Sequence, residues 1–505
     1  MSELLIVIII ILYFSLLFIV SQLTKGNSDN KTFFSGNKES LWYVVAFGMV
    51  GASLSGITFI SVPGDVGSID FTYFQVVIGY LFGYFVVAFV LLPIYYKQNL
   101  TSIYEYLGDR FGRNSHMTGA FFFFVSRVLG AAFRLFLVAI VLQEFVFNPW
   151  GIPFEITVII SILLIWIYTF RGGIKTVVWT DTLQTFLMIL SVILSIYFIT
   201  ESMNISFIDF IKSEDFNLKN KIFVTDNILE KNHFFKSFIG GVFITICMTG
   251  LDQDMMQKNL TCKTLYDAQK NMVVFSLILV IVTFIFLILG ALLFTFAEKN
   301  DILIPILNGR ENTDLLFPQI ALNSNLDITL SITFLLGLIA AAYSSADSAL
   351  TSLTTSFCID FMDIEKKKLR TQKQIRFRTH ILMSLILVIV IIIYKNYLST
   401  SVIDSLLIIA GFTYGPLLGL FSFGIITNHK IHDNLSIIVC LLSVLIITFI
   451  FYVPSEFIGG YKIGYELLPL NGLLTFIGLY IIRKKLPPNK GTSPCKSTTE
   501  SSKQH

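Results

Sequence analysis

The chain has 505 residues, of which 54% are hydrophobic and only 14% are charged, and its mean hydropathy is +0.76. Soluble domains carry about 25% charged residues, so the composition excludes an ordinary soluble protein and indicates a helical membrane protein. The five cysteines form no CxxC pair, which argues against a disulfide framework or a zinc site. The net charge of +3 is no argument for nucleic acid, and we expect none as a partner.

Apolar stretches recur along the whole chain, and each is long enough to cross a bilayer, which takes roughly twenty residues. The first is expected to be a true span, because Glu3 stands where a signal peptide has basic residues and no cleavage-type segment follows. No polar stretch is large enough to hold an enzyme core, so we expect no enzyme. The thirteen predicted spans cover about 3–22, 41–62, 72–95, 117–146, 153–170, 176–200, 234–256, 272–297, 326–357, 378–395, 400–427, 434–453 and 467–483.

Basic residues divide unequally between the loops on the two sides of these spans. With the N-terminus outside, the inside loops hold about twenty-five Lys and Arg and the outside loops about eight. Positive charge marks the cytoplasmic side. We therefore expect a multi-pass protein of the cytoplasmic membrane, N-terminus outside and C-terminus inside, which functions as a monomer. The inside loops are 24–40, 96–115, 171–175, 257–270, 358–378, 428–433 and 483–505.

Small and polar residues interrupt the second span near its middle, in the run VGASLSGITFISVPGDVGSIDF at 50–71. A helix broken here would expose carbonyl groups to a cation and amide groups to an anion, whereas the alternative is an intact helix with a Gly-rich packing face. The span at 234–256 is interrupted in the same way by IGGVFITICMTG. The two interrupted spans lie five helices apart, the spacing of an inverted five-plus-five repeat.

The repeat predicts an all-α polytopic protein with one leading and two trailing helices. The expected divisions are 1–40 (leading helix and cytoplasmic loop), 41–200 (first five-helix repeat), 201–233 (extracellular loop), 234–427 (second five-helix repeat), 428–483 (two trailing helices) and 484–505 (disordered cytoplasmic tail).

The span at 326–357 contains AAYSSADSALTSLTTS, which places a carboxylate, Asp347, and many hydroxyls in an otherwise apolar helix. Hydroxyls that bond back to their own helix are the simplest interpretation. A ligand set for a hard cation, which prefers oxygen ligands, is the other. The polar and small residues that recur at intervals of three and four, and so share one helical face, are Ala341, Ser344, Ser345, Ser348, Thr351, Ser352 and Thr355.

Ionisable residues within the predicted spans are functional candidates, because burying a charge in a bilayer is costly. Besides Asp347 they are Asp181, Asp252, Arg127 and Arg134. The two arginines are seven residues apart and share a helix face. Each needs an anion, which a solute, an aspartate or backbone carbonyls would supply.

The run YTFRGGIKTVVWTDTLQ at 168–184 resembles the G-G-x-x-x-V-x-W-T-D-x-x-Q signature of the sodium:solute symporters, and TSIYEYLGDRFG, QDMMQKNLTCKTLYDAQK and GFTYGPLLGLFSFGI also resemble segments of that family. The resemblance covers about residues 5–450 and implies a LeuT-type fold. It also implies a first sodium site formed by carbonyl groups of the broken second span and by carbonyl and hydroxyl groups of the AAYSS run. Those residues are Gly51, Leu54, Ala341, Ser344 and Ser345.

Some members of the family bind a second sodium ion deeper in the same helix. The matching residues here are Asp181, Asp347 and Ser348, and Asp347 stands where the family usually has a hydroxyl. Two like charges close together in a low dielectric do not both stay ionised without a cation. The resemblance therefore implies a second site that takes either a cation or a proton.

The run LSGITFISVP is similar to the sialic acid transporters of the family, which place hydroxyls on the sugar acid and an arginine on its carboxylate. Aligned from the RGG side, that arginine is Arg134; aligned from TSIYEYL, the position is Gly130, and the choice stays open. A structural ion pair is the alternative role for Arg134. The substrate-binding candidates implied by the resemblance are Ser53, Ser55, Thr58, Gln75, Arg134, Thr245 and Met248.

These observations predict a sodium-coupled symporter that imports a small polar solute by alternating access, with an anionic solute such as sialic acid or another carboxylate preferred. A proton-coupled carrier of the same fold and a sodium symporter for a neutral solute are the alternatives. Na⁺ is the coupling ion, and we expect no cofactor.

Overall fold

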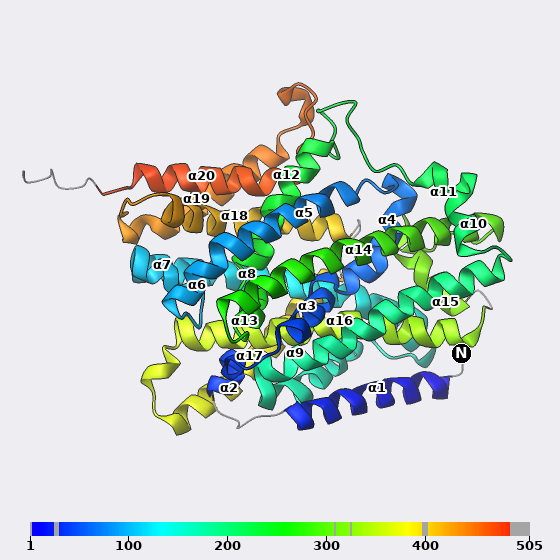
Figure 1. The fold of residues 1–505 in the computed structure, drawn as a ribbon, viewed down its shortest axis with the longest axis horizontal. Coiled ribbons are helices and arrows are strands. Elements are labelled where there is room, and N and C mark those ends of the chain that lie inside the picture. The colour runs from blue at the N-terminus through cyan, green and yellow to red at the C-terminus, as the bar shows by residue number, and fades with distance from the viewer. Residues whose placement is uncertain (1–2, 25–29, 308–309, 324–325, 396–401, 485–505) are drawn as a thin grey trace, which may run out of the picture.

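The computed structural model describes residues 3–24, 30–307, 310–323, 326–395 and 402–484, and within these ranges the chain is almost entirely helical (Figure 1). The predicted tail at 484–505 lies almost wholly outside them. A single short ribbon, β1 (Ile306–Leu307) with β2 (Arg310–Glu311), accompanies the helices. The helices are α1 (Glu3–Thr24), α2 (Asn30–Ser35), α3 (Trp42–Leu54), α4 (Gly56–Ile69), α5 (Phe74–Val86), α6 (Leu92–Gln98), α7 (Glu105–Arg110), α8 (Arg113–Leu142), α9 (Phe154–Ser202), α10 (Phe207–Lys212), α11 (Glu214–Lys219), α12 (Phe234–Thr245), α13 (Gln253–Asn259), α14 (Leu265–Lys299), α15 (Leu316–Asn323), α16 (Ile328–Ser356), α17 (Leu369–Tyr394), α18 (Val402–Ile426), α19 (Ser436–Tyr452) and α20 (Leu467–Ile481).

In the described ranges, nine helical segments are long and apolar enough to cross a membrane, and two bent helix pairs bring the number to as many as eleven. Phe154–Phe170 and Leu467–Ile481 are apolar but shorter. Every predicted span overlaps one of these segments. The count of thirteen stays a prediction, because these two shorter segments need their flanking residues to reach the length that spans a bilayer.

Both predicted helix breaks are confirmed. α3 and α4 meet at Ser55 with a bend of 56°, and the second pair, Phe234–Gly250 and Gln253–Asn259, bends by 67°. Ser55 has φ +24° and ψ 172°, a conformation that cannot continue a helix. The next residue, Gly56, packs where an added Cβ would collide with Val138 of α8. The run of small residues therefore does two things: it tolerates the turn and lets α8 approach it.

A third change of direction divides α9 into the two spans predicted at 153–170 and 176–200. Gly173 has φ +54° and ψ −144°, a backbone conformation that residues with a side chain rarely adopt. An added Cβ would also lie 2.6 Å from the ring and the carbonyl oxygen of Phe33. Glycine is thus required at this corner on both grounds.

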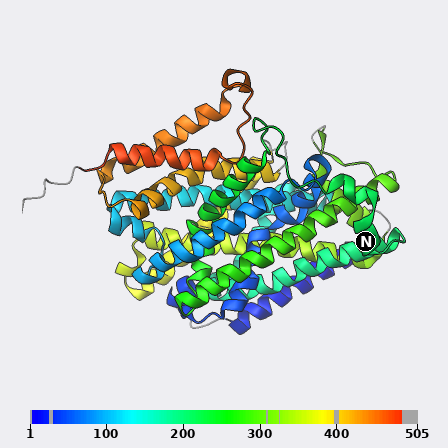
Figure 2. The same ribbon diagram turned by 45° about the horizontal axis from the view of Figure 1, so that its top comes forward.

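The helices around the first break form the centre of the molecule. α16 packs along α9, and α3 lies against α9 and α14. The leading helix α1 packs on the outside of α9, where Gln184 donates a hydrogen bond to the Tyr13 hydroxyl at 2.9 Å. The trailing pair α19 and α20 covers the opposite side, against α18, as Figures 1 and 2 show from two directions.

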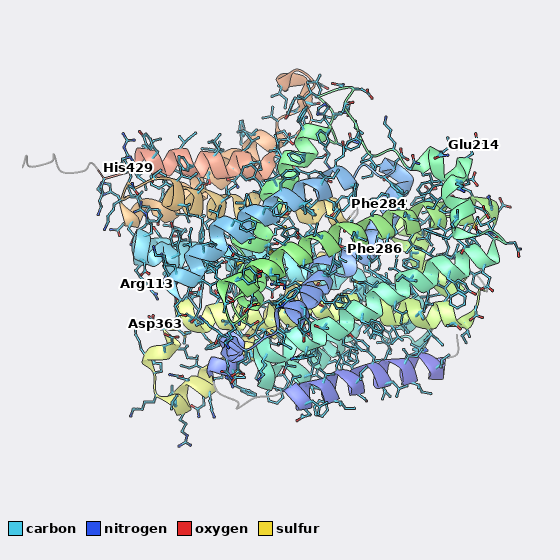
Figure 3. The ribbon with its side chains drawn as sticks, in the orientation of Figure 1. Arg113, Glu214, Phe284, Phe286, Asp363 and His429 are labelled. Carbon is cyan, nitrogen blue, oxygen red and sulfur yellow. The ribbon has the colours of Figure 1, made fainter. Side chains whose placement is uncertain are left out.

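The two ends of the bundle carry different polar contacts. At one end, where Figure 3 labels Arg113, Asp363 and His429, Arg113 forms a 3.3 Å ion pair with Asp363. Nearby, His116 contacts the buried carboxylate of Asp360 at 2.8 Å. Glu214 marks the opposite end in the same view. The contacts of Arg113 and His116 join the start of α8 to the segment that follows α16.

Candidate functional site

The end of α3 faces the polar stripe of α16 inside the bundle. The last carbonyl groups of any helix lack partners within that helix, and here the Ala52 carbonyl accepts a hydrogen bond from the Ser345 hydroxyl at 3.4 Å. The Gly51 carbonyl accepts the Ser55 amide at 3.1 Å. The structure therefore brings together the two segments that carry the predicted first sodium site. Its five residues are buried: Gly51, Leu54, Ala341, Ser344 and Ser345.

Gly51 also has a packing role, in addition to its predicted place in the first sodium site. Its amide donates a hydrogen bond to the Thr185 hydroxyl at 2.9 Å, and that hydroxyl donates in turn to the Asp181 carbonyl at 2.7 Å. A Cβ added to Gly51 would overlap the Thr185 hydroxyl oxygen and lie 3.2 Å from the Thr185 Cβ. The glycine thus allows α3 to rest directly on α9 beside the exposed carbonyls.

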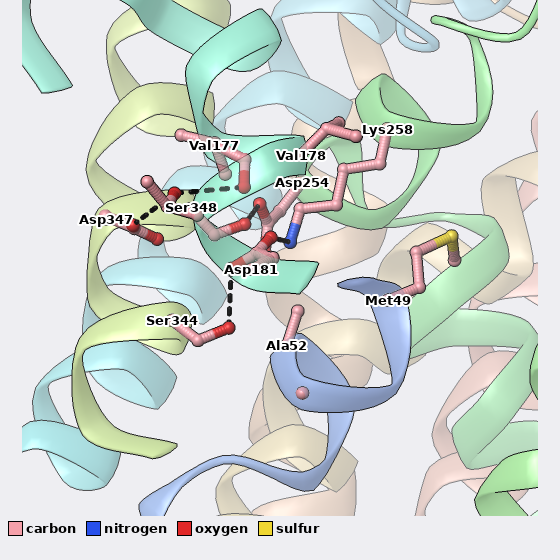
Figure 4. A network of polar contacts seen from close by, with 12 residues as sticks. Met49, Ala52, Val177, Val178, Asp181, Asp254, Lys258, Ser344, Asp347 and Ser348 are labelled. Carbon is pink, nitrogen blue, oxygen red and sulfur yellow. Dashed lines mark hydrogen bonds and ion pairs between the residues drawn. The ribbon is translucent and has the colours of Figure 1, made fainter. Parts of the chain in front are cut away.

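Asp181 of α9 lies next to this site and is fully buried. Ser344 donates a 2.5 Å hydrogen bond to one of its carboxylate oxygens, and the Lys258 ammonium lies 2.7 Å from the other. Figure 4 shows these three side chains converging from α16, α9 and α13. Because Ser344 uses its hydrogen for this bond, its oxygen lone pairs remain available to a cation.

A second buried ion pair lies beside the first. Asp254 of α13 contacts Arg127 of α8 through one oxygen and accepts a hydrogen bond from Ser348 of α16 through the other. Asp252 caps the start of α13 by accepting the Asp254 amide at 2.8 Å, and it also accepts a hydrogen bond from Tyr414. α13 is therefore anchored to α8, α16 and α18 by its acidic residues.

Asp347 is also buried, but it contacts other side chains than Asp181 and Asp254 do. Its carboxylate accepts hydrogen bonds from the Tyr168 hydroxyl at 2.8 Å and the Thr180 hydroxyl at 3.4 Å, both on α9. Its second oxygen has no hydrogen-bond partner among the described residues. The predicted second site, Asp181 with Asp347 and Ser348, therefore has each member engaged with a separate partner.

Lys258 and Asp254 are central to this network, yet neither is among the site residues predicted from the sequence. Lys258 was counted in the inside loop 257–270, which is wrong: it belongs to α13 and is only 1% exposed. The usable signal was the four-residue spacing of Asp254 and Lys258 directly after an interrupted span, because such residues share a helix face.

A cavity opens beside the α3–α4 break, between α3, α4, α5, α8, α12, α13, α14 and α18. Six of the seven predicted substrate residues line it: Ser53, Ser55, Thr58, Arg134, Thr245 and Met248. Further hydroxyl groups come from Tyr73, Tyr80, Tyr84, Thr249 and Thr283. Leu54 lines the cavity as well, so the pocket adjoins the predicted first sodium site.

Gln75 is the exception, since it does not line the cavity. Its amide nitrogen donates to the carbonyls of Thr72 at 3.1 Å and Asn232 at 3.0 Å, and its oxygen accepts the Val224 amide at 3.0 Å. These bonds fasten the 220–233 loop to the start of α5. The structure thus places Gln75 apart from the other substrate candidates.

The two arginines of α8 both reach the cavity, but they differ in their partners. Arg127 is paired with Asp254 and lies 3.9 Å from Asp252. Arg134 is 8% exposed and has no ion-pair or hydrogen-bond partner in the part of the chain that the structure describes. A buried, unpaired guanidinium in a cavity is a strong site for a carboxylate, which it can bind through two parallel hydrogen bonds.

Comparisons with known proteins agree with this geometry. The model of the sodium:solute symporter family matches residues 33–432. The sodium/sialic acid symporter NanT of Aliivibrio fischeri is 27% identical over 419 residues, covering 79% of this chain and 78% of its own. Sodium-coupled monocarboxylate transporter 1 of Mus musculus is 26% identical over 411 residues, covering 79% of this chain and 65% of its own.

A solved structure of a Na⁺-coupled sialic acid symporter, in a substrate-bound outward-open state, is similar to this chain. It superimposes with a TM-score of 0.80 at 20% identity, covering 95% of this chain and 99% of that one. At that identity the likeness concerns the fold, and it confirms the predicted LeuT-type helical architecture.

Proposed function

Because the chain belongs to the sodium:solute symporter family, we propose that it imports a small carboxylate-bearing solute together with Na⁺ by alternating access. The observation that supports this class of solute is Arg134, a buried guanidinium in the cavity that forms no ion pair or hydrogen bond with any described residue. An anionic solute removes the cost of leaving that charge unpaired. A neutral solute would leave Arg134 as it is.

Within the carboxylates, we propose a polyhydroxylated sugar acid of the sialic acid class. Ser53, Ser55 and Thr58 line the cavity together with apolar side chains, and three tyrosines add further donors and acceptors. Each hydroxyl of a sugar needs such a partner when it leaves water. The name of the Aliivibrio fischeri relative supports the same class, whereas a simple monocarboxylate would use few of these hydroxyl groups.

We propose that Na⁺ binds between the end of α3 and α16, through carbonyl groups of Gly51, Leu54 and Ala341 and the hydroxyls of Ser344 and Ser345. A cation there would hold the broken helix against α16 and so fix the pocket wall that Leu54 and its neighbours provide. Solute and Na⁺ would then favour each other's binding, which is the requirement for coupling. The protein acts in the cytoplasmic membrane as a monomer, N-terminus outside, and needs no organic cofactor.

The test is uptake by purified protein in liposomes with an inward Na⁺ gradient. We expect sialic acid to accumulate with Na⁺ but not with K⁺ or choline at fixed pH. Replacing Na⁺ also separates proton coupling, because a proton-coupled carrier would continue to work in K⁺. Uptake that is independent of Na⁺ would refute the proposal.

The solute assignment is tested by Arg134→Gln. A hydrogen bond to a charged group contributes about 1.5–3 kcal/mol, so KM for sialic acid should rise about ten- to a hundredfold. Arg134→Lys should retain part of the affinity, because the charge remains. Arg113→Gln removes the same charge from the end of the bundle and serves as the matched control. An unchanged KM in Arg134→Gln would contradict carboxylate binding at this residue.

A further inference from the structure

We infer that the Lys258 ammonium is a built-in cation that fills the carboxylate site at Asp181, so that one Na⁺ accompanies each solute. The inference rests on the proposed sodium-coupled import and specifies how many ions drive it. It starts from an observation independent of the solute: a lysine and an aspartate, 1% and 0% exposed, in contact at 2.7 Å.

Oxygen donors from two helices converge at this position as they would around a bound cation. Ser344 contacts the Asp181 carboxylate from α16, Ser348 follows one turn later on the same helix, and all three side chains are buried (Figure 4). An ammonium group is a compact point charge at the end of a flexible stem. Lys258 delivers that charge from α13 directly to the carboxylate.

The neighbouring polar side chains have partners of their own, apart from the second Asp347 oxygen, which has none in the described parts of the chain. Ser348 donates its hydrogen bond to Asp254, which Arg127 neutralises from the other side. Asp347 accepts hydrogen bonds from Tyr168 and Thr180 of α9. The pairs Lys258–Asp181 and Arg127–Asp254 thus each join one fixed positive charge to one carboxylate.

A fixed ammonium also repels any cation that approaches Asp181. Two unit charges 4 Å apart at an effective dielectric constant of about 20 repel each other strongly enough to lower an affinity about a thousandfold. The predicted first sodium site is less affected, because its ligand Ser344 contacts the other Asp181 oxygen, and the carboxylate charge there offsets part of the repulsion. The structure therefore favours one transported Na⁺ over two.

One Na⁺ with one monovalent anion carries no net charge across the membrane. We expect wild-type uptake to show a sodium Hill coefficient of 1, a flux ratio of one Na⁺ per solute in dual-label experiments, and a rate that does not change when a K⁺ gradient with valinomycin sets the membrane potential. Sodium-dependent uptake with two Na⁺ per solute would overturn the inference and leave the proposed function intact.

Lys258→Ala removes the built-in cation and opens space beside Asp181. We expect its flux ratio and Hill coefficient to rise to about 2 and its uptake to become faster at an inside-negative potential, whereas Lys258→Arg keeps the wild-type ratio. An unchanged ratio in Lys258→Ala would also overturn the inference.

Lys258→Ala also leaves a buried carboxylate without its partner, which threatens folding. If that variant yields no folded protein, Lys258→Ala combined with Asp181→Asn removes both charges, and we expect it to recover folded protein that retains one Na⁺ per solute. Failure of this neutral pair to fold, when Asp181→Asn alone does fold, would show that Lys258 is not the counter-charge of Asp181.

Discussion

Replacing Gly51 by alanine tests how closely α3 must approach α9 for the sodium site to form. The new methyl group would overlap the Thr185 hydroxyl oxygen and lie 3.2 Å from the Thr185 Cβ. Either the hydroxyl turns away or α3 moves outward. The first response breaks the 2.9 Å bond from the Gly51 amide and the 2.7 Å bond to the Asp181 carbonyl. The second displaces the carbonyl groups that face α16.

The size of the effect follows from these two contributions. Inserting a methyl group into a packed interior costs about 1–3 kcal/mol, and each lost hydrogen bond about 1 kcal/mol. Gly51→Ala should therefore destabilise the protein by about 3–5 kcal/mol and weaken Na⁺ binding at least several-fold. We expect a lower melting temperature in detergent and a higher half-saturating Na⁺ concentration for uptake.

Thr185→Ala provides the matched partner, because it removes the hydroxyl with which the new methyl group collides. The double variant Gly51→Ala/Thr185→Ala should melt above Gly51→Ala alone, although below wild type, since the hydrogen bonds stay lost. Such an interaction between the two changes is expected only for residues in contact. If Gly51→Ala leaves both melting temperature and Na⁺ affinity unchanged, or if the double variant is no better, the packing argument is incorrect.

Two further predictions concern the coupling ion and pH. Ser345→Ala should raise the half-saturating Na⁺ concentration about tenfold, corresponding to about 1.4 kcal/mol. Ser352→Ala on the same helix should not, because the Ser352 hydroxyl donates its hydrogen bond to the Ala349 carbonyl of its own helix. Equal effects of the two substitutions would contradict the first sodium site. Glu105, in the loop helix α7 outside the spans, has its pKa raised from 4.5 to about 7 by burial and by the nearby Asp360 carboxylate. The folded state therefore binds more protons than the unfolded state, and stability falls as pH rises from 4.5 to 7. Discounted for partial exposure, the loss of folding stability is about 1–2 kcal/mol. Glu105→Gln should therefore raise the melting temperature at pH 8 but not at pH 4.5. An equal shift at both pH values would contradict the raised pKa of Glu105 as the cause.

The helix breaks could be predicted because their cause is local. Small and polar residues lower the helix propensity and the hydrophobicity of a span at the place where it bends, so the sequence around Ser55 carries the signal itself. The buried stripe of α16 was predictable for a similar reason, since a three-and-four spacing defines one helix face wherever the helix lies.

Partnerships between distant segments could not be predicted. Arg127 and Arg134 share a helix face, and nothing near them in the chain distinguishes them. Within the described residues, only Arg127 of the two forms ion pairs, because Asp252 and Asp254 lie beside it. These aspartates are more than a hundred residues later in the chain and come close to α8 through the second bend. Lys258 was misplaced for the opposite reason, because counting loop charges treats every lysine outside an apolar run as exposed.

Gln75 shows the same limit at the edge of the pocket. Its polar side chain in an apolar span is the pattern expected of a substrate ligand, but its amide is used by backbone groups of Val224 and Asn232. Those groups belong to a loop without periodicity, and backbone hydrogen bonds leave no trace in residue type. The family resemblance could therefore identify which segments form the wall of the pocket, but not the role of every polar residue in those segments.

The hydroxyls of Ser344 and Ser348 have a mechanical consequence for α16. They hold it at two points, one turn apart, to carboxylates that are themselves held by Lys258 and Arg127 from other helices. A slide of α16 along its axis, or a rotation about it, would break both attachments at once. The motion of lowest energetic cost is therefore one in which α16, α9 and α13 move together as a rigid body. A hinge is then expected where these helices end.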